Sequence, residues 1–164
     1  MSGEMRVGLG WDRHRLVAGR RLVLGGMEIP HDRGLEGHSD GDVLLHAVVD
    51  ALLGAAGLGD IGDRFPPSDP KWKDADSRSL LAEALAEVRR ADWTPVNVDM
   101  VLVAEAPRLG ERKAALAAGV ASLLGLPPGA ANLKAKTAEG LGPEGAGECM
   151  EAHAVVLLAR RPPS

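Results

Sequence analysis

The sequence predicts an α/β fold of the α+β type: one domain over residues 1–164, with about three helices packed on one face of a small mixed β-sheet. Three observations support this prediction. The chain has 164 residues and 45% of them are hydrophobic, which suits one domain with a sizeable core. Stretches with helical apolar spacing alternate with short stretches typical of strands. Two of those strands are apolar at successive positions, so both of their faces favour burial.

The first part of the chain is expected to contain a strand, a hairpin and a helix. Gly25-Gly26 lies between apolar residues and predicts the hairpin turn. Ser39 followed by Asp42 is the Ser-x-x-acid signature of a helix N-terminus, and the helix should end near Gly54 or Gly57. In chain order, the expected elements are a strand at 5–12, the hairpin at 21–29, a loop at 30–41 and this helix.

The second part of the chain predicts two more helices and three more strands. The stretch 57–76 is rich in Gly, Pro and Asp, and a long irregular stretch of this kind is usually functional or mobile. The tail at 161–164 is expected to be flexible. The elements between these two stretches are a helix at 77–91, a strand at 96–106, a helix at 111–125, and strands at 132–139 and 149–161.

The strand sequences "VDMVLVA" (98–104) and "HAVVLLA" (153–159) predict an oligomer. Successive residues of a strand point to opposite faces, so these strands present apolar side chains on both. The expected helices can cover one face of the sheet. The other face then needs another chain, and we expect the sheets of neighbouring copies to meet in the middle of an assembly.

The composition argues against several classes of partner. The formal net charge is −4 and only 2% of residues are aromatic, which disfavours binding to nucleic acid or to anionic lipid. No apolar run approaches the ~20 residues of a membrane span. Cys149 is the only cysteine, which fits a reducing compartment. We therefore expect a cytoplasmic protein that has neither a nucleic-acid nor a membrane partner.

A first candidate site combines Asp12, His14 and His46. Asp12 and His14 are two residues apart, which puts both side chains on one face of an extended strand. His46 lies one turn into the expected helix, with Asp42 and Asp50 four residues away on either side. One aspartate and two histidines form a suitable catalytic zinc set, and a neighbouring acid could accept the free ring N–H of His46. The alternative is a turn feature beside a satisfied core histidine.

Three loop segments are candidates for contacts with a substrate. His38 and Ser39 lie where a phosphate would meet the start of the expected helix. Asp60 and Gly62 could bind a sugar hydroxyl, and the segment 107–108 could shape a pocket for a base. The alternative, which each stretch taken alone favours, is an ordinary helix cap or surface loop.

A further candidate is the segment "LKAKTAEGLG" (133–142). Lys134, Lys136 and the Thr137 hydroxyl can hold phosphate oxygens. Glu139 suits Mg²⁺, which is commonly bound by one or two carboxylates together with substrate phosphates. The alternative is a solvated edge strand with alternating charges.

These stretches together resemble the 2-C-methyl-D-erythritol 2,4-cyclodiphosphate synthase family of the non-mevalonate route to isoprenoids. The resemblance covers residues 5–160 and is most specific in the pair of D-x-H and HSDGD-x-x-x-H. The matching motifs, in chain order, are "GWDRH", "GHSDGDVLLHAVVDALLGAAGLGDIG", "FPPSDP", "DADSRSLL", "NVD", "AEAP" and "LKAKTAEGLG".

The resemblance implies a homotrimer with active sites between subunits, in which the second face of the sheet is buried. It implies a zinc ion on Asp12, His14 and His46, and a second divalent ion, Mg²⁺ or Mn²⁺, on Glu139. His38 and Thr137 are the implied catalytic residues, which steady the phosphates. The implied substrate-binding residues are Asp12, Arg13, His14, His38, Ser39, Asp60, Ile61, Gly62, Phe65, Asp69, Ala104, Ala106, Pro107, Arg108, Lys136, Thr137 and Glu139.

The implied reaction converts 4-diphosphocytidyl-2-C-methyl-D-erythritol 2-phosphate to the cyclic diphosphate and CMP. Its nucleophile is a phosphate already ionised at neutral pH, which agrees with the lack of a nucleophile–base pair in the motifs. Pro143 and Ala146 depart from the Phe and Arg common in the family, which weakens the expectation of a ligand site on the trimer axis. Two other functions fit the same residues: a metal-dependent phosphohydrolase and a non-catalytic module that binds zinc or a nucleotide.

Overall fold

The computed structural model describes residues 3–160, and the tail expected to be flexible lies outside them. The strands are β1 (Met5–Ala18), β2 (Leu22–Leu24), β3 (Met27–Ile29), β4 (Arg33–Leu35), β5 (Trp93–Val103), β6 (Ala131–Lys136) and β7 (Cys149–Arg160). The helices are α1 (Val43–Ala56), α2 (Ile61–Arg64), α3 (Ser77–Arg90), α4 (Arg112–Leu124) and α5 (Gly142–Gly145), with one 3₁₀ turn, η1 (Pro70–Trp72).

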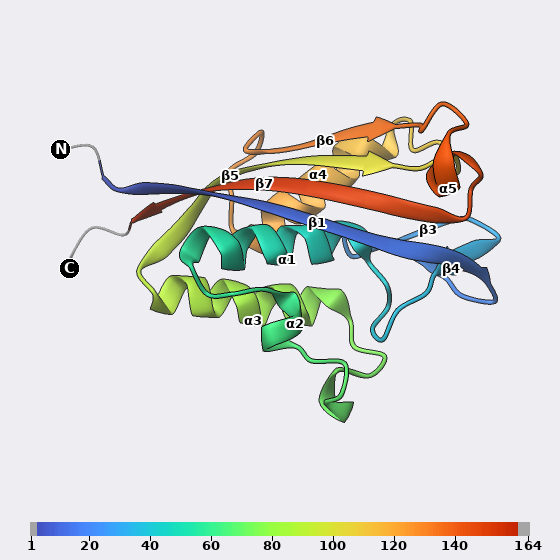
Figure 1. Cartoon of the computed structure of the whole chain (residues 1–164). Helices are drawn as coiled ribbons and strands as arrows, with labels where there is room; N and C mark the ends of the chain where they lie inside the picture. The colour runs from blue at the N-terminus through green and yellow to red at the C-terminus, as the bar shows by residue number, and fades with distance from the viewer. Residues whose placement is uncertain (1–2, 161–164) are drawn as a thin grey trace.

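Five strands form one mixed sheet in the order β4-β1-β7-β5-β6, in which only β5 and β6 are parallel (Figure 1). Helix α1 packs against β1 and β7, α3 packs on α1, and α4 packs against β6. The predicted α+β fold, with its three long helices on one face of a mixed sheet, is therefore confirmed. Among the described residues, every helix is too short or too polar to serve as a membrane span.

Helix α1 begins later than its sequence signature predicts. Asp42, not Ser39, is the N-cap, and its carboxylate accepts the backbone N–H of Leu45 at 3.0 Å. The same carboxylate accepts both N–H groups of the Gly25–Gly26 hairpin turn, at 3.0 and 2.7 Å. The prediction that Ser39 is the N-cap was wrong, because Asp42 caps the helix instead. Both residue types suit this position, and their spacing in the sequence does not show which of them will occupy it.

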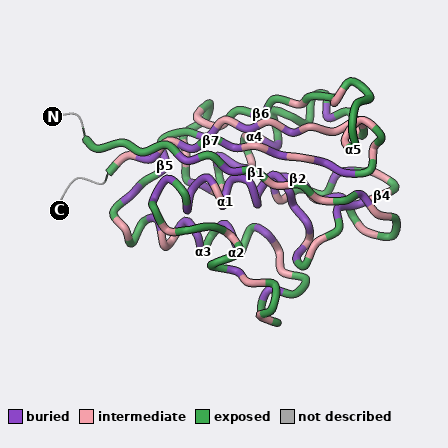
Figure 2. The backbone as a smooth tube through the Cα atoms, viewed as in Figure 1, coloured by how far each residue is buried: buried purple, intermediate pink, exposed green. Residues whose placement is uncertain are grey.

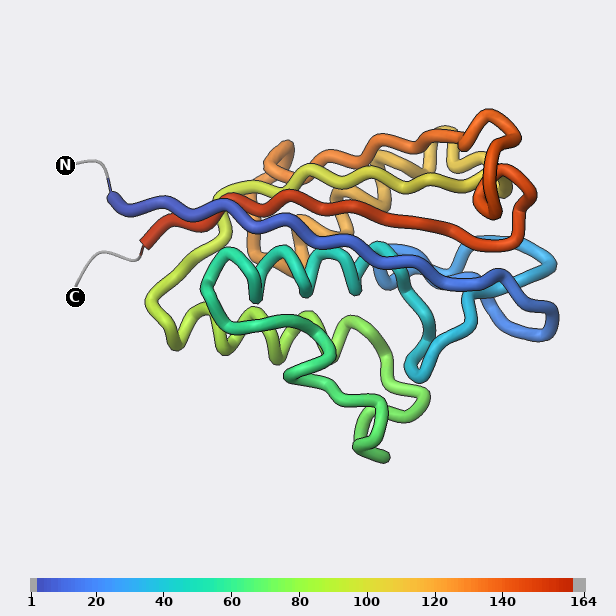
Figure 3. Tube along the Cα trace, viewed as in Figure 1, coloured from blue at the N-terminus to red at the C-terminus, as the bar shows by residue number. Residues whose placement is uncertain are grey.

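Tertiary pairing also extends the secondary structure beyond its local signals. β1 continues past residue 12 to Ala18 because it pairs first with β7 and then with β4, a strand inside the expected loop 30–41. The stretch 57–76, expected to be irregular, contains α2 and η1 and projects beside the helical layer (Figure 3). β6 ends at Lys136, so the residues that follow it form a turn rather than the last part of a strand.

The two central elements, α1 and β1, approach each other unusually closely. A Cβ added to Gly8 would lie 1.9 Å from the Ala51 carbonyl oxygen, and one on Gly10 would lie 1.8 Å from that of Ala47. Only glycine fits at these two positions because the obstructing atoms belong to the helix backbone. α1 is buried on nearly all sides, since the sheet covers it on one side and α3 on the other.

The opposite face of the sheet presents apolar side chains to the surroundings. Val7, Leu9 and Trp11 of β1 are 67%, 68% and 49% exposed, and Val155, the partner of Leu9 on β7, is 42% exposed. Figure 2 shows exposed and buried residues alternating along β1. The chain therefore buries one face of its sheet and leaves a second, apolar face open, which we call the open face.

The glycine contacts generate a test of the fold. Gly10→Ala should lower the free energy of unfolding by at least about 2 kcal/mol, because the added methyl group meets helix backbone that has no room to move. Gly54→Ala is the matched control: this glycine is exposed within α1 and a Cβ there meets nothing within 4 Å, so stability should rise by about 0.5–1 kcal/mol. Urea denaturation measures both. Equal effects of the two substitutions would contradict the close approach of α1 and β1.

Candidate metal centre and flanking pockets

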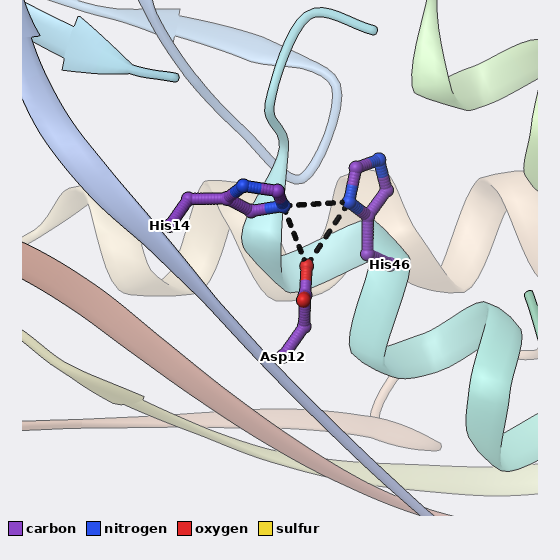
Figure 4. A group of neighbouring side chains, drawn as sticks. All are labelled: Asp12, His14 and His46. Atoms are coloured by element: carbon purple, nitrogen blue, oxygen red, sulfur yellow. Dashed lines mark hydrogen bonds and ion pairs between the residues drawn. The ribbon is translucent and has the colours of Figure 1, made fainter. Parts of the chain in front are cut away.

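Asp12, His14 and His46 converge at the junction of β1 and α1 (Figure 4). Asp12 and His14 project from the helix-facing side of β1, and His46 reaches them from the first turn of α1. His14 Nε2 lies 2.8 Å from Asp12 Oδ2, and His46 Nδ1 lies 3.0 Å from each of these atoms. The predicted grouping of these three side chains is confirmed.

This donor set fits a single metal ion. Zinc bonds of about 2.0–2.2 Å to nitrogen and oxygen keep two ligands of one ion within about 4 Å of each other, and all three pairs meet that limit. Two imidazoles and a carboxylate leave one tetrahedral position open, as catalytic zinc sites do. The arrangement can therefore hold a divalent cation and present it to a ligand.

The electrostatics of the cluster favour a bound positive charge. Burial works against ionisation of Asp12, but the two histidine rings outweigh it and hold the pKa of this carboxyl well below its usual range. Burial also works against the charged form of His14, but the Asp12 carboxylate outweighs it and raises the pKa of the ring. Asp12 is half-buried, and a carboxylate that favours the protonated form of a neighbouring ring also favours a metal cation bound in the same place.

Within residues 3–160, the second ring nitrogen of His46 contacts serine hydroxyls rather than an acid. His46 Nε2 lies 2.9 Å from Ser77 Oγ and 3.1 Å from Ser39 Oγ. The expected acceptors are engaged elsewhere: Asp42 caps α1, and Asp50 accepts a backbone N–H of α2 at 2.8 Å. Sequence reasoning missed Ser77, whose only signal was its place at the start of a helix far along the chain.

A pocket of about 220 Å³ opens beside the cluster. It brings together eight predicted site residues and adds apolar walls, including Trp72, whose ring meets that of Phe65 edge to face at 4.9 Å between centroids. The pocket is lined by Asp12, His14, His38, Ser39, His46, Ile61, Gly62, Phe65, Pro67, Trp72 and Leu80. The cluster thus faces a partly apolar cavity.

A second pocket of about 330 Å³ lies where β5 and β6 end, and shares no lining residue with the first. Five predicted site residues line it: Ala104, Pro107, Arg108, Lys136 and Thr137. The other lining residues are Leu102, Glu105, Leu109, Gly110, Lys113 and Ala135. The structure therefore separates the predicted site residues into two groups on different strands of the same sheet.

The turn after β6 belongs with the second pocket. Glu139 lies on this turn and accepts a hydrogen bond from Thr137 Oγ1 at 3.1 Å. Glu105, which sequence reasoning did not single out, accepts the backbone N–H groups of Ala138 at 2.9 Å and Gly140 at 3.3 Å. Its carboxylate therefore holds the turn that carries Thr137 and Glu139 against the end of β5.

Besides Glu139, four predicted site residues lie outside the linings of both pockets. Asp60 caps α2 through the N–H of Asp63 at 2.9 Å, and Asp69 caps η1. Arg13 points to the open face, where it pairs with Glu151 at 2.6 Å. Ala106 immediately precedes the segment 107–108 and is exposed.

The fold and the cluster define a small α+β protein with a candidate three-ligand metal site where its first strand meets its first helix. Comparison with known families is then decisive: the chain belongs to the YgbB family, whose model matches residues 5–159. A curated relative from Bordetella petrii named 2-C-methyl-D-erythritol 2,4-cyclodiphosphate synthase is 56% identical over 160 residues, which cover 98% of this chain and 99% of the relative. The resemblance inferred from the motifs is confirmed.

Solved structures agree with this assignment. A 2-C-methyl-D-erythritol 2,4-cyclodiphosphate synthase in a CDP-bound form matches with a TM-score of 0.86 and 43% identity, covering 93% of this chain and 99% of that one. The bifunctional IspDF of Campylobacter jejuni matches with a TM-score of 0.92 and 42% identity. That match covers 97% of this chain but only 43% of the Campylobacter chain, so this chain corresponds to one part of it.

The electrostatics of the cluster can be tested in the metal-free protein. Asp12→Asn should lower the pKa of His14, because the substitution removes the carboxylate that raises it and leaves the opposing effect of burial. Nuclear magnetic resonance of the histidine ring protons against pH measures this change. Asp50→Asn is the control, since its carboxylate is bonded to α2, and it should leave the pKa of His14 near the wild-type value. An unchanged His14 titration in Asp12→Asn would refute the pairing.

Proposed function

We propose that this chain converts 4-diphosphocytidyl-2-C-methyl-D-erythritol 2-phosphate to 2-C-methyl-D-erythritol 2,4-cyclodiphosphate and CMP, as a phosphorus–oxygen lyase of isoprenoid precursor synthesis in the cytoplasm. The observation that carries the proposal is the Asp12–His14–His46 cluster, in a chain 56% identical to a relative that bears the synthase name. A related structure in a CDP-bound form supports a substrate linked to cytidine diphosphate.

The proposal assigns the metal ligands as follows. Asp12, His14 and His46 would hold Zn²⁺, and Glu139 would hold Mg²⁺ or Mn²⁺. When bound, these ions would neutralise charge on phosphate oxygens and fix their positions. Local cations of this kind also account for how a chain with net charge −4 could attract a polyanionic substrate.

The residues around the cluster would act by positioning. The attacking 2-phosphate is already ionised, so no side chain needs to remove a proton from it. His38, exposed at the rim of the first pocket, and Thr137, in the second, would donate hydrogen bonds to the phosphates as charge shifts between them. Alignment of the reacting groups can lower such a barrier by roughly 7–11 kcal/mol.

The two pockets suit two parts of one substrate. The first pocket, with Ile61, Gly62 and Phe65 beside the cluster, would take the methylerythritol part and a phosphate. The second, with Pro107 and Arg108, would take the cytidine part. Asp60, Asp69 and Arg13 lie outside the pocket linings and would contact the substrate only after local rearrangement.

A homotrimer would bring the two pockets together. The pockets lie on separate parts of one chain, and the open face of the sheet carries Val7, Leu9 and Trp11, which are apolar and exposed. Association through that face with closed three-fold symmetry would bury it and set the first pocket of one copy beside the second pocket of the next. Each active site would then be shared between two subunits.

The decisive experiment identifies the product by phosphorus NMR. Purified protein with Zn²⁺, Mg²⁺ and the diphosphocytidyl substrate should give two coupled resonances of a cyclic diphosphate and CMP in equal amount. Uncoupled monophosphate signals would identify a phosphohydrolase, and unchanged substrate would favour a binding module. His46→Ala is the matched negative variant and should lose both stoichiometric zinc and turnover, because it removes one of three zinc ligands.

Substitution of Glu139 tests the second metal. Glu139→Gln should lower kcat by about 10²–10³-fold, the range typical for loss of one group that stabilises charge in a transition state. Zinc content and the unfolding midpoint should stay at the wild-type values, because Glu139 is exposed and distant in sequence from the zinc ligands. Normal turnover at low magnesium would rule out this assignment.

A mixture of the two inactive variants tests the shared site. If His46 and Glu139 act from neighbouring copies, trimers reassembled from equal amounts of His46→Ala and Glu139→Gln chains should regain about a quarter of wild-type activity, because about one interface in four unites two intact halves. Light scattering should give about three times the mass of one chain. No recovery from reassembled trimers would mean that both residues act within one chain.

A further inference from the structure

Ser77, the first residue of α3, is fully buried against the back of the candidate metal centre. Its hydroxyl lies 2.9 Å from His46 Nε2, on the side of the ring opposite the metal cluster. The same hydroxyl donates a hydrogen bond to Asp40 Oδ1. His46, Ser77 and Asp40 thus form a continuous chain of hydrogen bonds that leads away from the cluster.

The direction of these hydrogen bonds follows from counting protons. An ionised Asp40 carboxylate accepts only, so the single hydroxyl proton of Ser77 must point to it. Ser77 Oγ can therefore only accept from His46, and the ring must carry a proton on Nε2. The other nitrogen, Nδ1, lies 3.0 Å from Asp12 Oδ2, a carboxylate oxygen that also only accepts, so Nδ1 is free of a proton only when a metal ion binds there. With a metal on Nδ1, the remaining ring proton would be the one on Nε2 that Ser77 Oγ accepts.

Other hydrogen bonds hold the acceptor rigidly in place. Asp40 Oδ2 accepts the backbone N–H of Ser77 at 3.0 Å, and Asp40 Oδ1 accepts that of Asp42 at 3.1 Å. The backbone N–H of Asp40 donates to the Ala75 carbonyl at 3.0 Å. The loop before α1 and the start of α3 are therefore tied together around the Ser77 hydroxyl.

The nearby Ser39 hydroxyl does not impose a proton direction in this way. It lies 3.1 Å from His46 Nε2 and accepts from the backbone N–H of Gly41 at 3.3 Å, but among the described residues it has no carboxylate partner. Its own proton can therefore turn toward either neighbour. Ser77 is therefore the hydroxyl whose proton direction is fixed, because its O–H donates to the Asp40 carboxylate.

We propose that Ser77, backed by Asp40, is a positioning residue that accepts the Nε2–H of His46 and so holds the ring with Nδ1 turned toward the metal site. The inference rests on the metal site of the proposed function. Metal-bound histidines commonly donate their second N–H to an oxygen acceptor, and loss of that acceptor typically weakens metal binding about 10–100-fold. Here the acceptor is supplied by a helix that contributes no metal ligand.

The test measures zinc affinity by competition of the metal-free protein with a chromogenic chelator. Ser77→Ala should bind zinc about 10–100-fold more weakly than the wild type. Ser77→Thr retains a hydroxyl and should recover most of the affinity. Ser79→Ala, an exposed serine of the same helix, is the matched control and should bind zinc as the wild type does.

Nitrogen-15 NMR of labelled histidine reads the tautomer directly and does not depend on activity. In the zinc-loaded wild type, His46 should carry its proton on Nε2 and bind zinc through Nδ1. In zinc-loaded Ser77→Ala the Nε2 signal should move from its wild-type position, because the N–H has lost its acceptor. A zinc-loaded wild type in which His46 is protonated on Nδ1 would overturn the inference, even if Ser77→Ala failed to fold.

The two proposals fail in different ways. If the wild type binds zinc tightly and forms the cyclic product while Ser77→Ala binds zinc equally well, the positioning role is refuted and the proposed function stands. If the wild type binds no zinc, both are refuted. Weaker zinc binding in Ser77→Ala together with a shifted Nε2 signal supports the positioning role.

Discussion

The close contact between α1 and β1 determines the geometry on which the rest of the structure depends. Gly8 and Gly10 let the strand backbone touch the helix backbone at Ala51 and Ala47. Strand residues alternate between faces, so the next two residues on the helix-facing side are the aspartate and histidine of the cluster. His46 precedes Ala47 on the helix. Because Gly8 and Gly10 have no side chains, α1 can lie close enough to β1 for the three side chains of the cluster to reach one ion.

Asp42 sets the position of α1 along the strand. Its carboxylate caps the helix and also accepts both N–H groups of the Gly25–Gly26 turn, so one buried group joins a hairpin to a helix start. Burial raises the pKa of Asp42 to about 6, although the backbone N–H groups of Leu45 and Gly26 favour its charged form. Because the Asp42 carboxylate fixes where α1 begins, it also fixes the position of His46 relative to the sheet.

The two faces of the sheet have different roles. The helix-facing side carries the core and the cluster, whereas the open face carries an apolar region at Val7, Leu9 and Trp11 beside a charged pair, Arg13–Glu151. Such a face is stable in water only if its apolar part is small or covered, and here it spans the neighbouring strands β1 and β7. The same alternation along β1 that places two residues of the cluster on one side therefore places exposed apolar side chains on the other.

Much of this protein could be predicted from local patterns. Helical spacing located the three long helices, Gly25-Gly26 located the hairpin, and the D-x-H pair with His46 located the cluster, because each signal involves residues close together in the sequence or a strongly specific combination of motifs. The α+β class and the family followed from the same residues.

The tertiary structure alone decided which group caps α1, where β1 ends, and what binds the far nitrogen of His46. Ser39 and Asp42 both suit a helix cap by type, and only the packing of the hairpin turn selects Asp42. Ser77 lies 31 residues from His46, and no spacing rule links them. The physical reason is the same in each case: local propensities and periodicities act over a few residues, whereas these contacts form only once distant segments pack around one core.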